Sequence, residues 1–338
     1  MSVNVYNHTS HIAHRTSPNH ISSSGRIQEI DSLRGFAIFL VVLGHAIILF
    51  PVNLKENFYC GILFDIIYSF HMPLMFVISG FCWTFTDYVA SVRKKFFRLV
   101  IPYAVFNVID MLPRQILSSL VRRPKPFSES LMKTLLYGGE FWFLYTLFII
   151  FMIYPLIFRV SGSSKRKMMI VAVILCALSW FLGRRGGVFM IGRAAYYMFF
   201  FHLGVMARQF YCREGKLPDI KFPAIALALT SALWMLLLFK IKVFPILTIF
   251  AGITASYIMT SYKSFNNAFS RFGKYSLQIY LLNGITLGIS RAIICNVLHV
   301  YNPFIIVAFN VFIDFFVSYA FIRYVCEKNK ITRFIMGM

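Results

Sequence analysis

Long apolar segments alternate with short polar and basic stretches along almost the whole chain. Each apolar segment approaches the ~20 residues that an α-helix needs to cross the hydrocarbon core of a bilayer. The pattern therefore predicts an all-α fold, a polytopic bundle of about ten transmembrane helices. We expect these helices near residues 35–52, 62–86, 97–112, 140–160, 167–183, 187–206, 222–239, 243–262, 274–296 and 303–325.

The composition agrees with a membrane protein and excludes an ordinary soluble one. Hydrophobic residues make up 59% of the 338 residues and charged residues only 14%, and the mean hydropathy is +0.70. Soluble domains usually carry roughly a quarter charged residues. Because a soluble core of this size cannot hide so much apolar surface, we expect a single domain over residues 27–338 with the lipid bilayer as its solvent.

The first 26 residues differ from the rest, since they are polar and lack the apolar core of a signal peptide. They predict a disordered cytoplasmic tail over residues 1–26. The histidines of this tail are also a residue type that binds metals, but we favour the tail interpretation: His8, His11, His14 and His20. The six cysteines show no CxxC spacing, so we expect neither a disulfide framework nor a metal site.

The net charge of +22 has two interpretations, which are compatible. Cytoplasmic loops of membrane proteins collect Lys and Arg, and one alternating set of loops holds 22 of the 34 basic residues. This bias predicts a multi-pass protein of the cell membrane with both termini in the cytoplasm. The second interpretation is an anionic ligand at the cytoplasmic face. No basic stripe is interleaved with aromatic residues, so no nucleic-acid partner is expected.

Two polar residues on the first expected helix are the strongest candidates for chemistry. Arg34 and His45 are eleven positions apart, close to three helical turns, so both face the same side with a rise of ~16 Å between them. An ionisable residue inside a membrane helix is costly and is a candidate site by default. The alternatives are a packing histidine for His45 and, for Arg34, a positive-inside anchor paired with Asp31.

Further polar positions are weaker candidates. His71 is expected at a depth similar to His45, and Pro73 kinks the second expected helix, which favours a cavity there. Ser79 beside Gly80 is more typical of a close helix contact than of a nucleophile. Lys95 and Arg98 belong to a basic cluster that suits a phosphate clamp or a simple positive-inside signal: Arg93, Lys94, Lys95 and Arg98. Glu140, Trp142 and Asn283 are polar or aromatic groups at or inside later helices.

Several of these segments together resemble the acyltransferase 3 family of membrane acyltransferases. That family is marked by an arginine, ten intervening residues and a histidine on its first helix, as in Arg34 and His45. The other segments that carry the resemblance follow in order over about residues 27–325: Phe70–Phe81, Arg93–Pro102, Phe141–Leu144 and Gly273–Leu282. Asn283 stands where the family often has a histidine.

The resemblance implies a ten-helix fold and the transfer of an acyl group from acyl-CoA, with acetyl-CoA as the expected donor, to a hydroxyl. The expected acceptor is a sugar of a surface polysaccharide or of a lipid-linked glycan. Arg34 would bind the phosphates of the donor together with Lys95 and Arg98. His45 would act as a general base or as a nucleophile that relays the acyl group. The acceptor would contact residues that include His71, Ser79, Glu140, Trp142 and Asn283.

Two other classes of function stay open at this point. A transporter or flippase for a lipid-linked sugar or small anion also places polar residues inside the membrane, although no paired broken helices occur in matching halves. A purely structural membrane protein does not explain Arg34 and His45 on one side of a helix. The sequence leaves the oligomeric state, the acyl length and the identity of the acceptor open.

Overall fold

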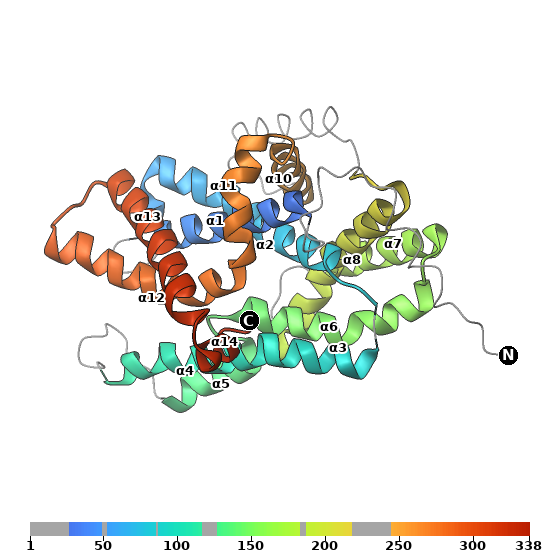
Figure 1. Cartoon of the computed structure of the whole chain (residues 1–338), viewed down its shortest axis with the longest axis horizontal. Helices are drawn as coiled ribbons and strands as arrows, with labels where there is room; N and C mark the ends of the chain where they lie inside the picture. The colour runs from blue at the N-terminus through green and yellow to red at the C-terminus, as the bar shows by residue number, and fades with distance from the viewer. Residues whose placement is uncertain (1–26, 49–52, 86, 117–126, 183–186, 218–244) are drawn as a thin grey trace.

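The computed structural model describes residues 27–48, 53–85, 87–116, 127–182, 187–217 and 245–338. These residues form helices and contain no strand (Figure 1), which confirms the all-α class. The expected tail over residues 1–26 and the expected helix near 222–239 lie outside the described residues.

Six helical segments of the described chain are long and apolar enough to cross a membrane. Their bounds are Gln28–Ile48, Phe58–Phe81, Phe127–Ser161, Val188–Glu214, Ser276–Val297 and Pro303–Cys326. With the whole set of helices, they make the chain a multi-pass membrane protein. The α-helices are α1 (Gln28–Ile48), α2 (Phe58–Phe81), α3 (Tyr88–Lys95), α4 (Ile101–Ile116), α5 (Phe127–Tyr137), α6 (Trp142–Ser161), α7 (Lys165–Leu182), α8 (Ile191–Glu214), α10 (Pro245–Met259), α11 (Lys263–Lys274), α12 (Ser276–Ala292), α13 (Pro303–Phe321) and α14 (Lys330–Ile335).

The expected number of about ten membrane helices is not confirmed. The helices of the structure do not match the expected apolar segments one for one, for two reasons. The third expected helix is part of a longer path, because α3 continues through a π-turn, η2 (Phe96–Val100), into α4. Four helices were not expected: α3, α5, α11 and α14. They are short or rich in polar residues, so the search for long apolar segments passes over them.

Helix α1 lies at the centre of the half of the molecule that contains α11, α12 and α13 (Figure 1). Helix α11 lies in close contact with the first half of α1, and glycines on both helices allow this approach. A Cβ added at Gly35 would collide with the backbone of Phe269, and one added at Gly273 would collide with that of Asp31. The ring of Phe36 also packs edge-on against Phe265, with 5.3 Å between centroids. This packing fixes the end of α1 that carries Arg34.

Helices α2 and α8 cross through small residues, as is common between membrane helices. A Cβ added at Gly80 of α2 would collide with the backbone of Phe201, and one added at Gly204 of α8 with that of Val77. Helix α2 also packs against α1 and α10. The second helix therefore connects the α1 side of the molecule with the α6–α8 side.

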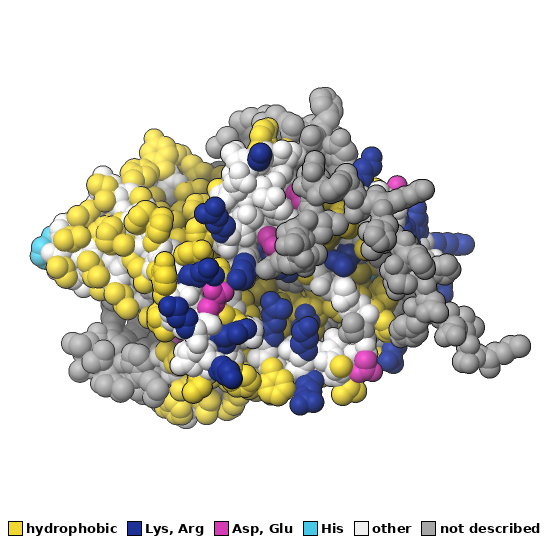
Figure 2. Space-filling view, viewed as in Figure 1, with side chains coloured by type: hydrophobic (Ala, Val, Ile, Leu, Met, Phe, Trp, Pro, Cys, Tyr) yellow, Lys and Arg dark blue, Asp and Glu magenta, His cyan; other side chains and the backbone are white. Residues whose placement is uncertain are grey.

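Charged and apolar side chains occupy different parts of the surface. Figure 2 shows Lys and Arg side chains gathered near the middle of one face, and a broad hydrophobic surface on the side where α12 and α13 lie in Figure 1. Exposed apolar side chains on α13 include Phe304, Phe312 and Phe316. Such a surface is suited to lipid, whereas the basic area requires water or anionic groups.

Candidate active site

The centre of the candidate site is a contact between α1 and α12. The Nδ1 atom of His45 lies 2.8 Å from Oδ1 of Asn283, and the pair is partly buried. Since an amide oxygen only accepts hydrogen bonds, Nδ1 carries the proton and donates it to Asn283. In the neutral imidazole, Nε2 is then the atom with the free electron pair, which is the form that accepts a proton from a hydroxyl.

The other end of the Asn283 amide is also relevant. Its Nδ2 atom is buried and has no hydrogen-bond partner among the described residues, and the residue as a whole is only 1% exposed. An unpaired buried donor costs about 1–3 kcal/mol. A donor of this kind beside a reactive imidazole is suited to bind a polar atom of a substrate.

Helix α2 supplies aromatic groups beside His45. Gly44 leaves room for Tyr68, since a Cβ at Gly44 would lie 2.6 Å from the Tyr68 ring. The Tyr68 ring is 4.7 Å from that of His71, measured between centroids. His71 is buried and donates from Nδ1 to the carbonyl of Ile67 at 2.7 Å, so its second nitrogen, Nε2, is the acceptor atom of the neutral ring.

Arg291 fixes the backbone next to His45. This arginine of α12 is fully buried and donates a hydrogen bond to the carbonyl of Ala46. Together with the bond from His45 to Asn283, it joins α12 to the last turn of α1 at two places. A buried ionisable residue in a membrane helix is a candidate functional residue, and here its visible role is to hold the reacting helix in place.

Glu140 and Trp142, two of the predicted acceptor residues, lie at the start of α6. Glu140 interacts electrostatically with both His45 and Tyr280, and its carboxylate forms an ion pair with Lys133 at 3.5 Å. The guanidinium of Arg193 lies over the ring of Trp142 at 4.4 Å, and Trp142 packs on Tyr197. Glu140 is thus close enough to influence His45, while Trp142 contacts α8.

Ser79 is the predicted residue with the simplest structural role. Its hydroxyl donates to the carbonyl of Met75 in its own helix at 2.8 Å. It stands beside Gly80 at the crossing of α2 and α8. These contacts agree with the helix-contact interpretation, and they give no separate sign of a nucleophile.

The predicted cations come together at the other end of α1. Lys95 interacts electrostatically with Arg98 and with Arg34, although α3 and α1 are separate in sequence. Burial, and then the neighbouring cations Arg98, Lys94 and Arg34, lower the pKa of Lys95 to about 8. Its ammonium also lies over the Phe151 ring at 4.0 Å. Arg34 pairs with Asp31 at 3.6 Å, as the sequence suggested.

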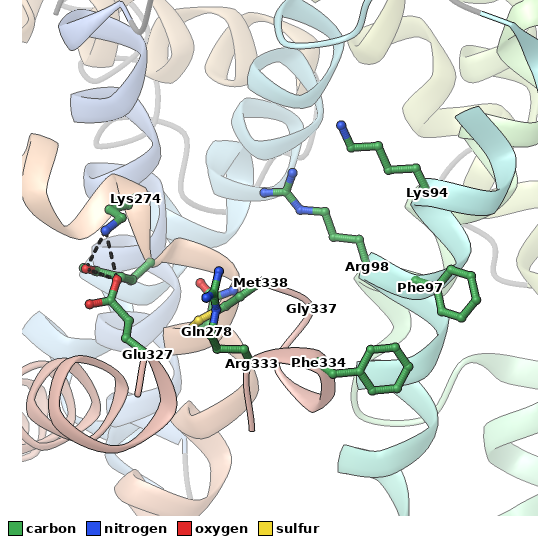
Figure 3. Close-up of a pocket in the computed structure, with 11 residues that line it drawn as sticks. Lys94, Phe97, Arg98, Lys274, Gln278, Glu327, Arg333, Phe334, Gly337 and Met338 are labelled. Atoms are coloured by element: carbon green, nitrogen blue, oxygen red, sulfur yellow. Dashed lines mark hydrogen bonds and ion pairs between the residues drawn. The ribbon is translucent and has the colours of Figure 1, made fainter. Parts of the chain in front are cut away.

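A pocket of about 750 Å³ opens beside these cations (Figure 3). In the close-up, Lys94 and Arg98 extend from one side, Lys274 and Glu327 lie on the other, and Arg333 lies below. Four cationic side chains against one carboxylate make this pocket suited to a polyanion. Its size falls in the range of small-molecule sites.

Glu327 gathers several donors at the edge of the pocket. Its carboxylate accepts hydrogen bonds from Lys274 at 2.9 Å, Tyr275 at 2.7 Å and Arg323 at 2.8 Å. These bonds, led by that from Lys274, lower the pKa of Glu327 to about 2. The carboxylate is therefore charged at neutral pH and holds the donors in a fixed arrangement.

The comparison with known proteins decides the family. The sequence profile of the acyltransferase domain known as acyltransferase 3 matches residues 27–323, most of the chain. The chain belongs to the acyltransferase 3 family. Like other acyltransferases, this one requires an acyl donor and an acceptor, and the expectation of the family from Arg34, His45 and the later motifs is confirmed.

A curated relative of this acyltransferase 3 protein is the nodulation protein NolL of Sinorhizobium fredii (strain NBRC 101917 / NGR234). The two are 27% identical over 156 residues, which cover 44% of this chain and 41% of NolL. The chain therefore matches about two fifths of the length of that relative. No solved structure matches the chain.

Sequence reasoning passed over several groups at this acyltransferase's candidate site. Tyr68 is hard to find because tyrosine is common in apolar segments, and only its packing on Gly44 brings it to His45. Lys274 and Arg333 read as ordinary loop cations, although they line the same pocket as Arg98. Arg291 was not passed over, since an ionisable residue within an expected membrane helix is a candidate by default, but its partner, the carbonyl of Ala46, cannot be read from the sequence.

Proposed function

We propose that the protein moves an acetyl group from acetyl-CoA to a sugar hydroxyl of a surface polysaccharide or lipid-linked glycan. The single observation that carries this proposal is the hydrogen bond from His45 to Asn283, because it leaves Nε2 of His45 as a base. Membership of the acyltransferase 3 family supports the reaction class. The sugar acceptor rests on the resemblance of the motifs to that family.

The donor binds at the basic end of α1. Arg34, Lys95 and Arg98 attract its phosphates, and their mutual proximity supports this role. Helix α1 is unbroken from Gln28 to Ile48, so Arg34 and His45 lie on one side of it with a rise of ~16 Å. A long flexible arm between phosphate and thioester, such as that of coenzyme A, suits this separation. The basic end faces the cytoplasm, in keeping with the positive-inside rule.

The reaction then needs one base and no covalent enzyme intermediate. Nε2 of His45 accepts the proton of the sugar hydroxyl while the oxygen attacks the thioester carbonyl. The tetrahedral intermediate collapses, the carbon–sulfur bond breaks, and the thiolate takes the proton back from the imidazolium. Asn283 keeps the ring in the required tautomer, and its buried Nδ2 donates to the developing oxyanion.

The acceptor approaches from the side of Glu140. The electrostatic interaction of Glu140 with His45 supports a position for this carboxylate beside the reacting hydroxyl. His71 and Trp142 are assigned to the same region. The ring of His71 packs against Tyr68, and the guanidinium of Arg193 lies over the ring of Trp142. Ser79 lies at the helix crossing and has no step in this mechanism.

The decisive experiment measures label transfer from [14C]acetyl-CoA by the purified protein in lipid nanodiscs, with candidate glycan acceptors. The wild-type protein transfers the label, and His45→Ala lowers the rate by ~10²–10⁴ while the protein still inserts. A flippase moves a lipid-linked sugar across the bilayer without coenzyme A and gives no labelled product. Undiminished transfer by His45→Ala refutes both the base and the acyl-relay versions.

A further inference from the structure

The pocket in Figure 3 has a third wall that lies outside the family-matched residues. The match ends at residue 323, whereas Glu327, Arg333, Phe334, Gly337 and Met338 all line the pocket. We call residues 327–338 the C-terminal segment. Within it, α14 is a short helix whose N-cap is Asn329, which accepts a hydrogen bond from the backbone of Ile331.

The C-terminal segment is held from both sides of the pocket. On one side the Phe334 ring packs against Phe97, with 5.9 Å between centroids, and a Cβ added at Gly337 would lie 2.5 Å from the carbonyl oxygen of Arg98. On the other side, Nε2 of Gln278 in α12 donates to the carbonyl of Met336 at 3.0 Å. The segment therefore connects α12 with the α3–η2 path, and the site of Arg333 is fixed relative to both.

The backbone at Gly337 explains why this approach is so close. Its φ of +67° is in the left-handed region that favours glycine, and the missing side chain lets the segment lie directly on the backbone at Arg98. The segment cannot shift toward η2 without collision. Arg333, on the last turn before Gly337, is thereby kept at the pocket.

Cations line the pocket on more than one wall. Lys94 and Arg98 are four residues apart on the α3–η2 path and belong to one side, while Lys274 and Arg333 come from other elements. A single phosphate is too small to use cations on all of these walls. A ligand with several phosphates, as in the nucleotide part of coenzyme A, can contact cations on several walls at once.

We propose that Arg333 is a donor-binding residue and that the C-terminal segment forms the wall of the pocket that holds the donor's phosphates. The inference rests on the proposed function for the identity of the donor. Arg333 lies beyond the residues matched by the family, and it joins Arg34, Lys95 and Arg98 as a cation that binds the donor. Arg333 is exposed, so its replacement leaves the packing of the helices intact.

The test measures binding of free coenzyme A to the purified protein in nanodiscs by calorimetry, with pantetheine, which lacks the nucleotide, as the second ligand. Arg333→Ala weakens coenzyme A binding by about tenfold, the usual effect of losing a charge-assisted hydrogen bond, and leaves pantetheine binding unchanged. Arg333→Lys restores part of the affinity. Lys330→Ala, on the same short helix but outside the pocket lining, is the matched control and binds as the wild type does.

A second variant tests the wall itself. Gly337→Val adds a side chain where Arg98 leaves no space and where φ is positive, so it displaces the segment and weakens coenzyme A binding as Arg333→Ala does. Equal affinity of wild type and Arg333→Ala overturns the inference while the proposed function stands. Failure of the wild type to bind coenzyme A overturns both. Binding that depends on Arg333 without any label transfer supports the inference and refutes only the proposed reaction.

Discussion

The two ends of α1 are built in opposite ways. Near its C-terminal end, the imidazole of His45 is partly buried and forms a side-chain hydrogen bond with Asn283 of α12. Near its N-terminal end, Arg34 and Lys95 lie close to Arg98, which lines a pocket together with exposed cations from other helices. The first arrangement depends on precise orientation, whereas the second depends on summed charge.

This difference separates catalysis from binding. A group that acts on the reacting atoms changes kcat when it is removed, while one of several cations changes mainly the KM for the donor. Several cations of the pocket contribute to donor binding, so the removal of any one of them changes the donor affinity only modestly. Substitutions at each end of α1 show whether kcat and the donor KM can be changed separately.

The largest effect after His45 itself is expected at Asn283. Asn283→Ala removes the acceptor of the His45 proton and lowers kcat by about tenfold to a hundredfold, with the donor KM unchanged. Steady-state kinetics with acetyl-CoA give both constants. In the His45→Ala background the same substitution causes a smaller loss, because the orientation of His45 no longer matters and only the donation from Nδ2 to the oxyanion is removed. A changed donor KM with normal kcat would mean that Asn283 contributes to donor binding and not to catalysis.

A smaller effect is expected at Arg34. Arg34→Ala raises the donor KM by about tenfold and leaves kcat nearly constant, since one of several phosphate contacts is lost. The loss of its ion pair with Asp31 adds little, because such partly exposed pairs contribute weakly. Arg271→Ala is the control, since Arg271 is an exposed cation of α11 that, unlike Arg34, is not among the cations acting on Lys95. Identical donor constants in both variants would remove Arg34 from the site.

The pH dependence of donor binding reports on Lys95. Its pKa of about 8 means that the side chain is a cation below that pH and becomes neutral above it, so the donor KM rises severalfold as the pH passes through about 8. Lys274 does not share this change, because hydrogen bonds from its ammonium to Tyr275 and Glu327 raise its pKa above the usual range. Lys95→Arg flattens the profile. A profile that is equally steep in this variant contradicts the assignment to Lys95.

The smallest effect is expected at Glu327. Glu327→Gln removes the negative charge from the basic pocket and lowers the donor KM by about twofold to threefold at low ionic strength. At high salt the difference disappears, because exposed charges are screened. Donor titrations at two salt concentrations measure this. A raised KM would mean that Glu327 serves mainly to orient Lys274 and Arg323.

The amino-acid sequence alone was enough to predict the family and the main candidate site residues, Arg34 and His45. The eleven-residue interval from Arg34 to His45 predicted two groups on one side of a helix, and α1 is a continuous helix through both. The pair of Arg34 with Asp31 follows from local spacing as well. By contrast, the contact of His45 with Asn283 joins residues 238 positions apart, and no local rule predicts it.

The sequence by itself determined that the chain is helical, is a membrane protein and resembles acyltransferases. Hydropathy and residue spacing are local properties, so they do not depend on how the helices pack. Only the tertiary structure decided which polar groups meet. It brought α11 against α1, packed Tyr68 on Gly44 next to His45, and placed Arg333 in the lining of the basic pocket. Those contacts depend on how helices cross, which is set by small residues such as Gly35 and Gly80 on facing surfaces and is not encoded in either helix alone.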